Sequence, residues 1–185
     1  MDAVLAAMRE VPREGFLPRR ARFRADFDGP ITIGHGQTNS QPRTVAAMLR
    51  LLQVQPGHKV LDVGAGSGWT TALLAHLTGP MGSVVGVELV PELAQWGAEN
   101  LARTRYDHAS IRTARPGVLG EPGSAPYDRI LVSAEARALP QELIEQLADG
   151  GRIVVPVSGT MMLGLRHGSD LELSEHGRYR FVPLL

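Results

Sequence analysis

The sequence predicts an α/β fold with a mostly parallel, doubly wound sheet and antiparallel strands at the C-terminal edge of that sheet. Two observations indicate this fold. Short apolar runs alternate with segments of helical periodicity through most of the chain. The last part of the chain instead alternates apolar and polar residues on both sides of His167-Gly168-Ser169, which is typical of a hairpin.

Most strands are predicted from short apolar runs, and the two hairpin strands are predicted from the alternation of apolar and polar residues. The strands are expected at 59–63, 84–88, 109–113, 128–133, 152–157, 161–166, 170–175 and 178–184. The helices are expected at 3–9, 70–77, 91–103 and 140–147, and from Pro42 onward. Proline is favoured at the first helical position, and Gly150-Gly151 is expected to end the helix over 140–147.

At 185 residues the chain is expected to form a single domain, 1–185, around one core. Its first part, 1–42, is expected to be a helical arm followed by a polar, glycine-bearing loop over 34–42. Ser40 or Gln41 is expected at the cap of the helix that begins near Pro42, so capping is one possible role for the Ser40 hydroxyl.

Composition excludes several classes of function. Basic and acidic residues number 19 each, so capture of nucleic acid or of an anionic membrane by bulk charge is not expected. Cysteine is absent, which excludes disulfides, thiolate zinc sites and a cysteine nucleophile. The histidines show no metal-ligand spacing, so no metal is expected. Neither a signal peptide nor an apolar run of spanning length is visible, and a cytoplasmic monomer is expected.

The most informative stretch is 60–69, which reads Val-Leu-Asp-Val-Gly-Ala-Gly-Ser-Gly-Trp. An apolar run passes through Asp62 into glycines at alternate positions, and a helical pattern follows. About twenty residues later a second apolar run ends at Glu88. Backbone can approach a cofactor closely at the glycines, and a carboxylate can accept hydrogen bonds from ribose hydroxyls. The stretch therefore predicts a site for a cofactor that carries a nucleoside, with an ordinary tight turn as the alternative.

Two cofactors compete for this turn. A dinucleotide site needs a glycine spacing that lets a helix N-terminus meet the pyrophosphate. Here Gly64, Gly66 and Gly68 alternate and are followed by the bulky Trp69. The Asp62 carboxylate would repel a pyrophosphate, but it would attract the cationic methionine end of S-adenosylmethionine. The pattern therefore favours S-adenosylmethionine over NAD.

Five segments, in the same order along the chain, resemble protein-L-isoaspartate O-methyltransferases. The segment 33–42 reads Ile-Gly-His-Gly-Gln-Thr-Asn-Ser-Gln-Pro and resembles the signature loop of that family. The other matching segments are 11–18, 62–69, 125–130 and 181–184. The resemblance covers nearly the whole chain, and the Gly-Gln-Thr-x-Ser pattern is specific to the family.

The resemblance implies a Rossmann-like class I methyltransferase. Such an enzyme moves a methyl group from S-adenosylmethionine to the α-carboxylate of an L-isoaspartyl residue in a damaged protein, and it leaves S-adenosylhomocysteine. The ester then closes to a succinimide, part of which opens to normal aspartate. The implied partner is a protein or peptide that bears isoaspartate.

Site residues carry over by position. Ser40 is the implied catalytic residue, a hydrogen-bond donor that aims the acceptor, and Gln37 and Thr38 are implied substrate contacts. The implied cofactor contacts are Asp62, Gly64, Ala65, Gly66, Gly68, Glu88, Leu89 and Gly117. No general base is needed, because a carboxylate is already ionised at neutral pH.

The chain departs from the family pattern around this site. Arg115-Pro116 stands where Gly-Asp is usual, and that aspartate commonly contacts the adenine amino group; Gly117 is retained. Asn39 and Gln41 replace the more usual apolar and small residues beside the loop serine.

The loop after the strand at 128–133 also differs from the family. There Arg137 either pairs with a substrate carboxylate or lies on the surface. These departures leave two alternatives open: a related carboxyl methyltransferase acting on aspartate in one dedicated peptide, and a non-catalytic module that binds S-adenosylmethionine.

Overall fold

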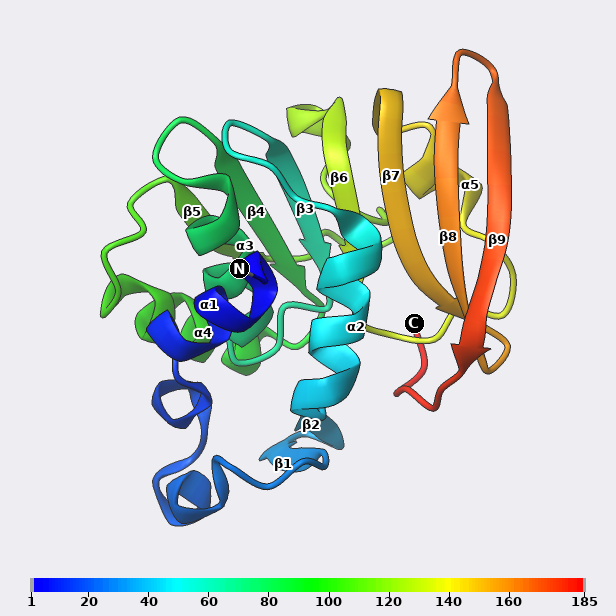
Figure 1. Cartoon of the computed structure of the whole chain (residues 1–185). Helices are drawn as coiled ribbons and strands as arrows, with labels where there is room; N and C mark the ends of the chain where they lie inside the picture. Colours follow the sequence, from blue (N-terminus) through cyan, green and yellow to red (C-terminus); the bar gives the residue numbers. More distant parts are fainter. Residues whose placement is uncertain (1, 185) are drawn as a thin grey trace.

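The computed structural model describes residues 2–184 and is built around a seven-stranded sheet (Figure 1). The strand order is β5-β4-β3-β6-β7-β8-β9. The first five strands in this order are parallel, and β8 and β9 are antiparallel to their neighbours. The bounds are β3 (Lys59–Val63), β4 (Ser83–Glu88), β5 (Ala109–Thr113), β6 (Tyr127–Val132), β7 (Leu147–Val157), β8 (Thr160–His167) and β9 (Asp170–Arg178). The predicted sheet, with its antiparallel C-terminal edge, is confirmed.

Helices cover both faces of the sheet, and a separate hairpin precedes it (Figure 1). The α-helices are α1 (Ala3–Glu10), α2 (Pro42–Leu52), α3 (Trp69–Thr78), α4 (Pro91–Ala102) and α5 (Gln141–Ile144). The 3₁₀ helices are η1 (Arg13–Phe16), η2 (Arg19–Arg24) and η3 (Pro122–Ser124), and the hairpin is β1 (Ile31–Gly34) with β2 (Gln37–Asn39). Side chains from α1 to α4 belong to one core cluster, and α5 packs into the other.

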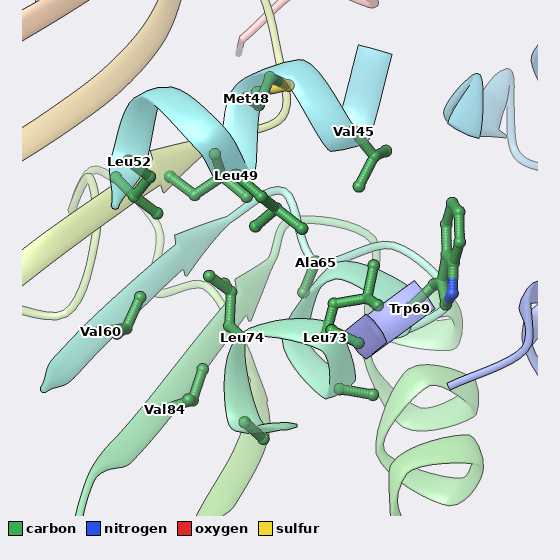
Figure 2. Close-up of a cluster of buried hydrophobic side chains, with 14 of the residues drawn as sticks. Val45, Met48, Leu49, Leu52, Val60, Ala65, Trp69, Leu73, Leu74 and Val84 are labelled. Carbon is green, nitrogen blue, oxygen red and sulfur yellow. The ribbon is translucent and has the colours of Figure 1, made fainter. Parts of the chain in front are cut away.

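The larger core lies between α2, α3 and the parallel strands (Figure 2). The apolar stripe of α2 is buried as its spacing predicts, and it packs with Leu73 and Leu74 of α3 above Val60 and Val84 of the sheet. Successive residues of β3 alternate between the two faces, so Val60 joins one cluster and Leu61 the other. Strands that are apolar on both faces are expected in a sheet covered on both sides.

The direction in which strands are added reverses at the centre of the sheet. The chain runs from β3 outward to β4 and β5, and then returns to place β6 on the other side of β3. In open parallel sheets, ligands bind beyond the carboxyl ends of the strands at such a reversal. The fold therefore places the glycine turn after β3 at the expected binding position.

The polar loop expected at 34–42 is partly a strand. Gln37–Asn39 pairs antiparallel with Ile31–Gly34, since the two glycines Gly34 and Gly36 allow a tight reversal at positive φ. The N-cap of α2 is Gln41, without a side-chain capping bond. The Asp28 carboxylate serves that helix end instead, accepting a hydrogen bond at 3.0 Å from the backbone N–H of Arg43.

Two other expectations from the sequence are wrong. The helix expected over 140–147 is limited to α5, because Leu147 already pairs with Tyr127 and begins β7. Gly150-Gly151 lies inside that strand as an irregularity and does not end a helix. The strand expected over 178–184 is also absent: β9 ends at Arg178, and the apolar residues after it pack on the core clusters.

None of the helices in the described part of the chain combines the length and the apolar character needed to cross a membrane.

Candidate active site

The turn after β3 requires glycine for its backbone geometry. Gly64, Gly66 and Gly68 have φ angles of 83°, 52° and 92°, in the left-handed region that residues with a Cβ rarely adopt. The third glycine also allows close helix packing, because a Cβ on Gly68 would lie 2.9 Å from the backbone oxygen of Gly97 in α4. The turn thus presents bare backbone at the start of α3.

Glu88 holds this turn from the neighbouring strand. It is the last residue of β4 and is 6% exposed. Its carboxylate accepts hydrogen bonds from the backbone N–H of Gly66 at 2.8 Å and of Val90 at 3.0 Å. Each oxygen keeps further acceptor capacity, and Glu88 lines the adjacent cavity. Glu88 is therefore an acceptor fixed in position for a pair of hydroxyl groups.

A cavity of about 600 Å³ lies at the carboxyl ends of the parallel strands. Its wall comes from the residues that follow β3, β4, β5 and β6, together with the β1–β2 hairpin and the C-terminal segment. The predicted site residues that line it are Gln37, Thr38, Gly64, Gly66, Glu88, Leu89 and Gly117. Its volume lies within the range of small-molecule sites.

Two predicted cofactor residues lie behind the cavity wall. Gly68 packs against α4. Asp62 is fully buried, and its Oδ2 accepts hydrogen bonds from the hydroxyls of Thr70 and Thr71, both at 2.7 Å. Its Oδ1 has no hydrogen-bond partner in the described part of the chain. Burial raises the pKa of Asp62 to about 6, against the lowering effect of the two threonine hydroxyls.

A recess of about 30 Å³ continues the cavity toward Ser40. It shares Thr38, Gly64, Gly66 and Ser133 with the larger cavity. Ser40 and Ala65 line the recess and not the larger cavity. Since Gln41 is the N-cap of α2, the Ser40 hydroxyl does not cap that helix.

Several lining residues were missed from the sequence. Ser133 and Ala134 follow β6, and their position at a strand end was a usable signal. The segment 182–184 lines the cavity because its backbone bonds to Glu135, through Glu135 N–H to the Val182 oxygen at 2.7 Å and Leu184 N–H to the Glu135 oxygen at 2.8 Å. No local pattern predicts that placement.

The departures from the family pattern lie partly on this wall. Arg115 lines the cavity and is tied to Glu121 at 3.0 Å, whereas Pro116 is not among the lining residues. Arg137 lines the cavity with an exposed side chain, and its backbone oxygen accepts a hydrogen bond from the Ser158 hydroxyl at 2.9 Å. Glu135 contributes no lining side chain.

The reversed strand order, the glycine turn and the buried acid at the end of β4 together define the class I methyltransferase fold. A crystal structure of a Plasmodium falciparum protein-L-isoaspartate O-methyltransferase in complex with S-adenosyl-L-homocysteine superposes with a TM-score of 0.87, at 28% identity over 100% of this chain and 91% of that chain.

Sequence comparisons identify the family. The model of the protein-L-isoaspartate(D-aspartate) O-methyltransferase family matches residues 1–185. A protein-L-isoaspartate O-methyltransferase of Methanopyrus kandleri is 46% identical over 100% of this chain and 84% of its own length. The enzyme of that name from Aeropyrum pernix is 48% identical over 98% of this chain and 72% of its own length. The chain belongs to the protein-L-isoaspartate (D-aspartate) O-methyltransferase family.

Proposed function

We propose that this chain transfers the methyl group of S-adenosylmethionine to the α-carboxylate of L-isoaspartyl residues in proteins and peptides. The observation that carries the proposal is the cavity in which Glu88 and the glycine turn meet the hairpin that leads to Ser40. Membership of the family supports the same donor and acceptor.

The residues present fit the cofactor. The buried Glu88 carboxylate, fixed by two backbone N–H groups, suits a ribose diol. Gly64 and Gly66 line the cavity without side chains, so the cofactor can approach their backbone closely. A Cβ on Gly66 would also crowd the Ile33 side chain, at 3.3 Å. Leu89 and Gly117 line the same wall. When bound, S-adenosylmethionine supplies an electrophilic methyl group on a sulfonium that leaves readily.

The Ser40 side of the site is suited to positioning the acceptor. The recess that Ser40 lines opens onto the backbone of the glycine turn, and Thr38 lies on the wall of both spaces. A carboxylate acceptor is ionised at neutral pH, so the Ser40 hydroxyl acts as a donor that orients it and no proton has to be removed. The contribution of the chain is alignment and exclusion of water.

Arg137 is proposed as a contact for an acidic group of the substrate. Arg137 lines the cavity, and the Ser158 hydroxyl donates a hydrogen bond to its backbone oxygen. A guanidinium matches a carboxylate with two parallel hydrogen bonds. This assignment favours the first of the two roles that the sequence left open for Arg137.

We further propose that residues 1–185 act as one catalytic domain, because the cavity takes wall residues from Ile33 to Leu184. The monomeric state, the cytoplasmic location and the lack of nucleic-acid binding stay predictions of the sequence.

A methyl-transfer assay tests the proposed function. The purified chain is incubated with methyl-labelled S-adenosylmethionine and either an L-isoaspartyl peptide or its normal aspartyl isomer, and base-labile methanol is measured. We expect label on the isoaspartyl peptide alone. Label on the aspartyl isomer would favour the dedicated-peptide alternative. Binding of the cofactor without any ester would indicate a non-catalytic module.

A further inference from the structure

A buried arginine ties the N-terminal arm to the end of the hairpin. Arg13, in η1, is 5% exposed. Its guanidinium donates hydrogen bonds to the backbone oxygens of Asn39 at 3.0 Å and Ser40 at 2.9 Å, and to the Asn39 side-chain oxygen at 2.7 Å. It also donates to the backbone oxygens of Phe27 and Gly29, both at 2.8 Å.

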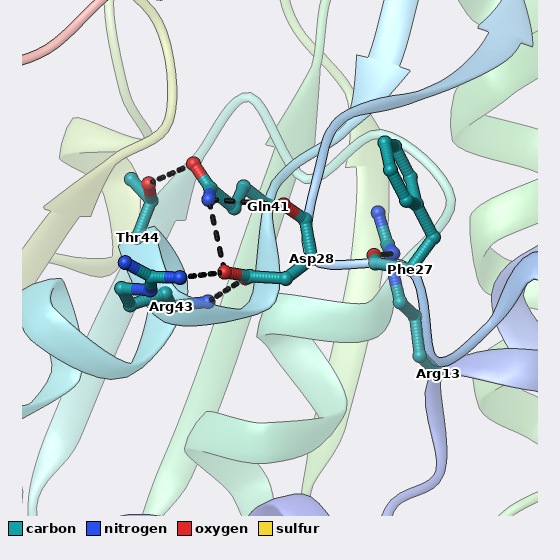
Figure 3. Close-up of polar contacts among 6 residues, drawn as sticks. All are labelled: Arg13, Phe27, Asp28, Gln41, Arg43 and Thr44. Carbon is teal, nitrogen blue, oxygen red and sulfur yellow. Dashed lines mark hydrogen bonds and ion pairs between the residues drawn. The ribbon is translucent and has the colours of Figure 1, made fainter.

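The exposed residue Asp28 also contacts the segment that follows Ser40 (Figure 3). Asp28, which follows Phe27, bonds to the side chains of Gln41 at 3.2 Å and Arg43 at 2.6 Å. The backbone on both sides of Ser40 is therefore fixed, by Arg13 before α2 and by Asp28 at the first turn of α2. Burial lowers the pKa of Arg13 to about 10, so its guanidinium keeps its charge at neutral pH.

The Asn39 side chain continues this network to the glycine turn. Its amide oxygen accepts from Arg13, and its amide nitrogen donates to the Ser67 hydroxyl at 3.1 Å. Both residues are buried, Asn39 at 5% and Ser67 at 2% exposure. Ser67 lies between Gly66 and Gly68, and its backbone oxygen accepts from the Asn100 side chain of α4 at 3.0 Å.

Asn39 is thus the one side chain in the described structure that hydrogen-bonds both to Arg13 and to the glycine turn. It stands directly before Ser40, at a position where the family more usually has an apolar residue, which cannot make either bond. A buried polar link with both ends satisfied fixes geometry strongly, because breaking it leaves desolvated groups without partners.

We propose that Asn39 is a positioning residue that couples the cofactor turn to the substrate hairpin. When a cofactor orders the turn, the Ser67–Asn39–Arg13 link holds Ser40 in its place at the recess, and the acceptor peptide binds more tightly. This proposal rests on the proposed function for the identity of the two ligands. The mechanism of coupling is mechanical: one amide bonds to both elements.

Three variants distinguish the effect of the Ser67–Asn39–Arg13 link from an effect on the stability of the fold. Asn39→Leu keeps the size of the side chain and removes both hydrogen bonds. Ser67→Ala removes only the acceptor in the turn and leaves the Arg13 contacts in place. Asn39→Asp is the conservative rescue, because its carboxylate can accept from Arg13 and from the Ser67 hydroxyl, which rotates freely. Thermal unfolding and S-adenosylhomocysteine affinity check that each variant is folded.

The measurement is the affinity of an L-isoaspartyl peptide with and without saturating S-adenosylhomocysteine, by calorimetry. In the unmodified chain we expect the product cofactor to tighten peptide binding by about three- to tenfold, the worth of one or two hydrogen bonds. Asn39→Leu and Ser67→Ala should reduce that ratio to below about twofold, and Asn39→Asp should retain most of it.

If the variants lower the peptide affinity equally with and without S-adenosylhomocysteine, Asn39 is only structural. If the ratio of the two peptide affinities is unchanged in both Asn39→Leu and Ser67→Ala, the coupling is likewise overturned. A second readout needs no peptide: S-adenosylhomocysteine should slow hydrogen exchange at the amides of 37–40 in the unmodified chain, and less so in the two link-breaking variants. If the chain fails to methylate the peptide but shows this exchange pattern, the proposed function fails and the coupling stands.

Discussion

Replacing Asp62 by asparagine should remove a pH dependence from the stability of the fold. The Asp62 carboxylate is 0% exposed, and its Oδ2 oxygen accepts from two threonine hydroxyls, while its Oδ1 oxygen has no partner among residues 2–184. Loss of hydration raises its pKa from 3.8 to about 6, and the nearby charge of Glu88 acts in the same direction.

The size and sign of the effect follow from linkage. A rise in pKa from 3.8 to about 6 corresponds to about 3 kcal/mol of unfolding free energy, since one pKa unit is about 1.36 kcal/mol. The folded state holds the proton of Asp62 more tightly than the unfolded state. The stabilisation of the folded state by this proton is therefore fully present below about pH 4, and it is lost as the pH rises to about 6. Above that pH the contribution no longer changes.

Urea unfolding at a series of pH values measures this contribution. The difference in unfolding free energy between the unmodified chain and Asp62→Asn should change by about 3 kcal/mol between about pH 4 and about pH 7, with the unmodified chain losing stability relative to the variant. Asp107→Asn, at an exposed carboxylate, controls for the loss of one negative charge. Parallel curves for the unmodified chain and Asp62→Asn would refute the reasoning, because they would show that Asp62 has the same pKa in both states.

Three further predictions concern the cavity. Ser40→Ala should lower kcat about tenfold with little change in cofactor affinity, since one orienting hydrogen bond is lost; unchanged turnover would remove Ser40 from the mechanism. Glu88→Gln should weaken S-adenosylmethionine binding by about 10- to 100-fold, because hydrogen bonds to a charged acceptor are lost and the turn loses a partner; calorimetry gives the dissociation constant, and an unaltered value would contradict the ribose role. Arg137→Gln should raise the KM for isoaspartyl peptides several-fold and reduce the salt dependence of that KM, with kcat nearly unchanged; an equal fall in kcat would instead place Arg137 at the reacting atoms.

Most of the fold was predictable because its signals are local. The strand before the glycine turn and the strand that ends at Glu88 were found from apolar runs that the structure buries on both faces of the sheet. The strand expected over 178–184 was wrong because its apolar run has another cause. The segment after Arg178 is apolar because it packs on the core beside Glu135, and an apolar pattern does not distinguish such packing from strand pairing.

The residues of the candidate site also differ in whether a local sequence pattern predicts their contacts. Gly64, Gly66 and Glu88 carry a signature in their spacing, and the structure brings them together at a 2.8 Å hydrogen bond between residues 22 positions apart. Arg13 lies in the segment 11–18 that resembles the family, but that segment does not indicate which groups Arg13 contacts. Its bonds to Asn39 span 26 positions and depend on how the arm folds back, so they are visible only in three dimensions.

The distribution of buried polar bonds fits the chemistry of the proposed reaction. Transfer of a methyl group to a carboxylate needs neither an acid nor a base, so rate depends on the alignment of oxygen, methyl carbon and sulfur. In this chain the buried polar groups near the cavity are engaged in holding backbone: Glu88 bonds two amides of the cofactor side, and Arg13 bonds five carbonyl and amide oxygens of the arm and hairpin within 3.0 Å. Asn39 and Ser67 join these two groups through side-chain hydrogen bonds, so the position of Ser40 should depend on that link.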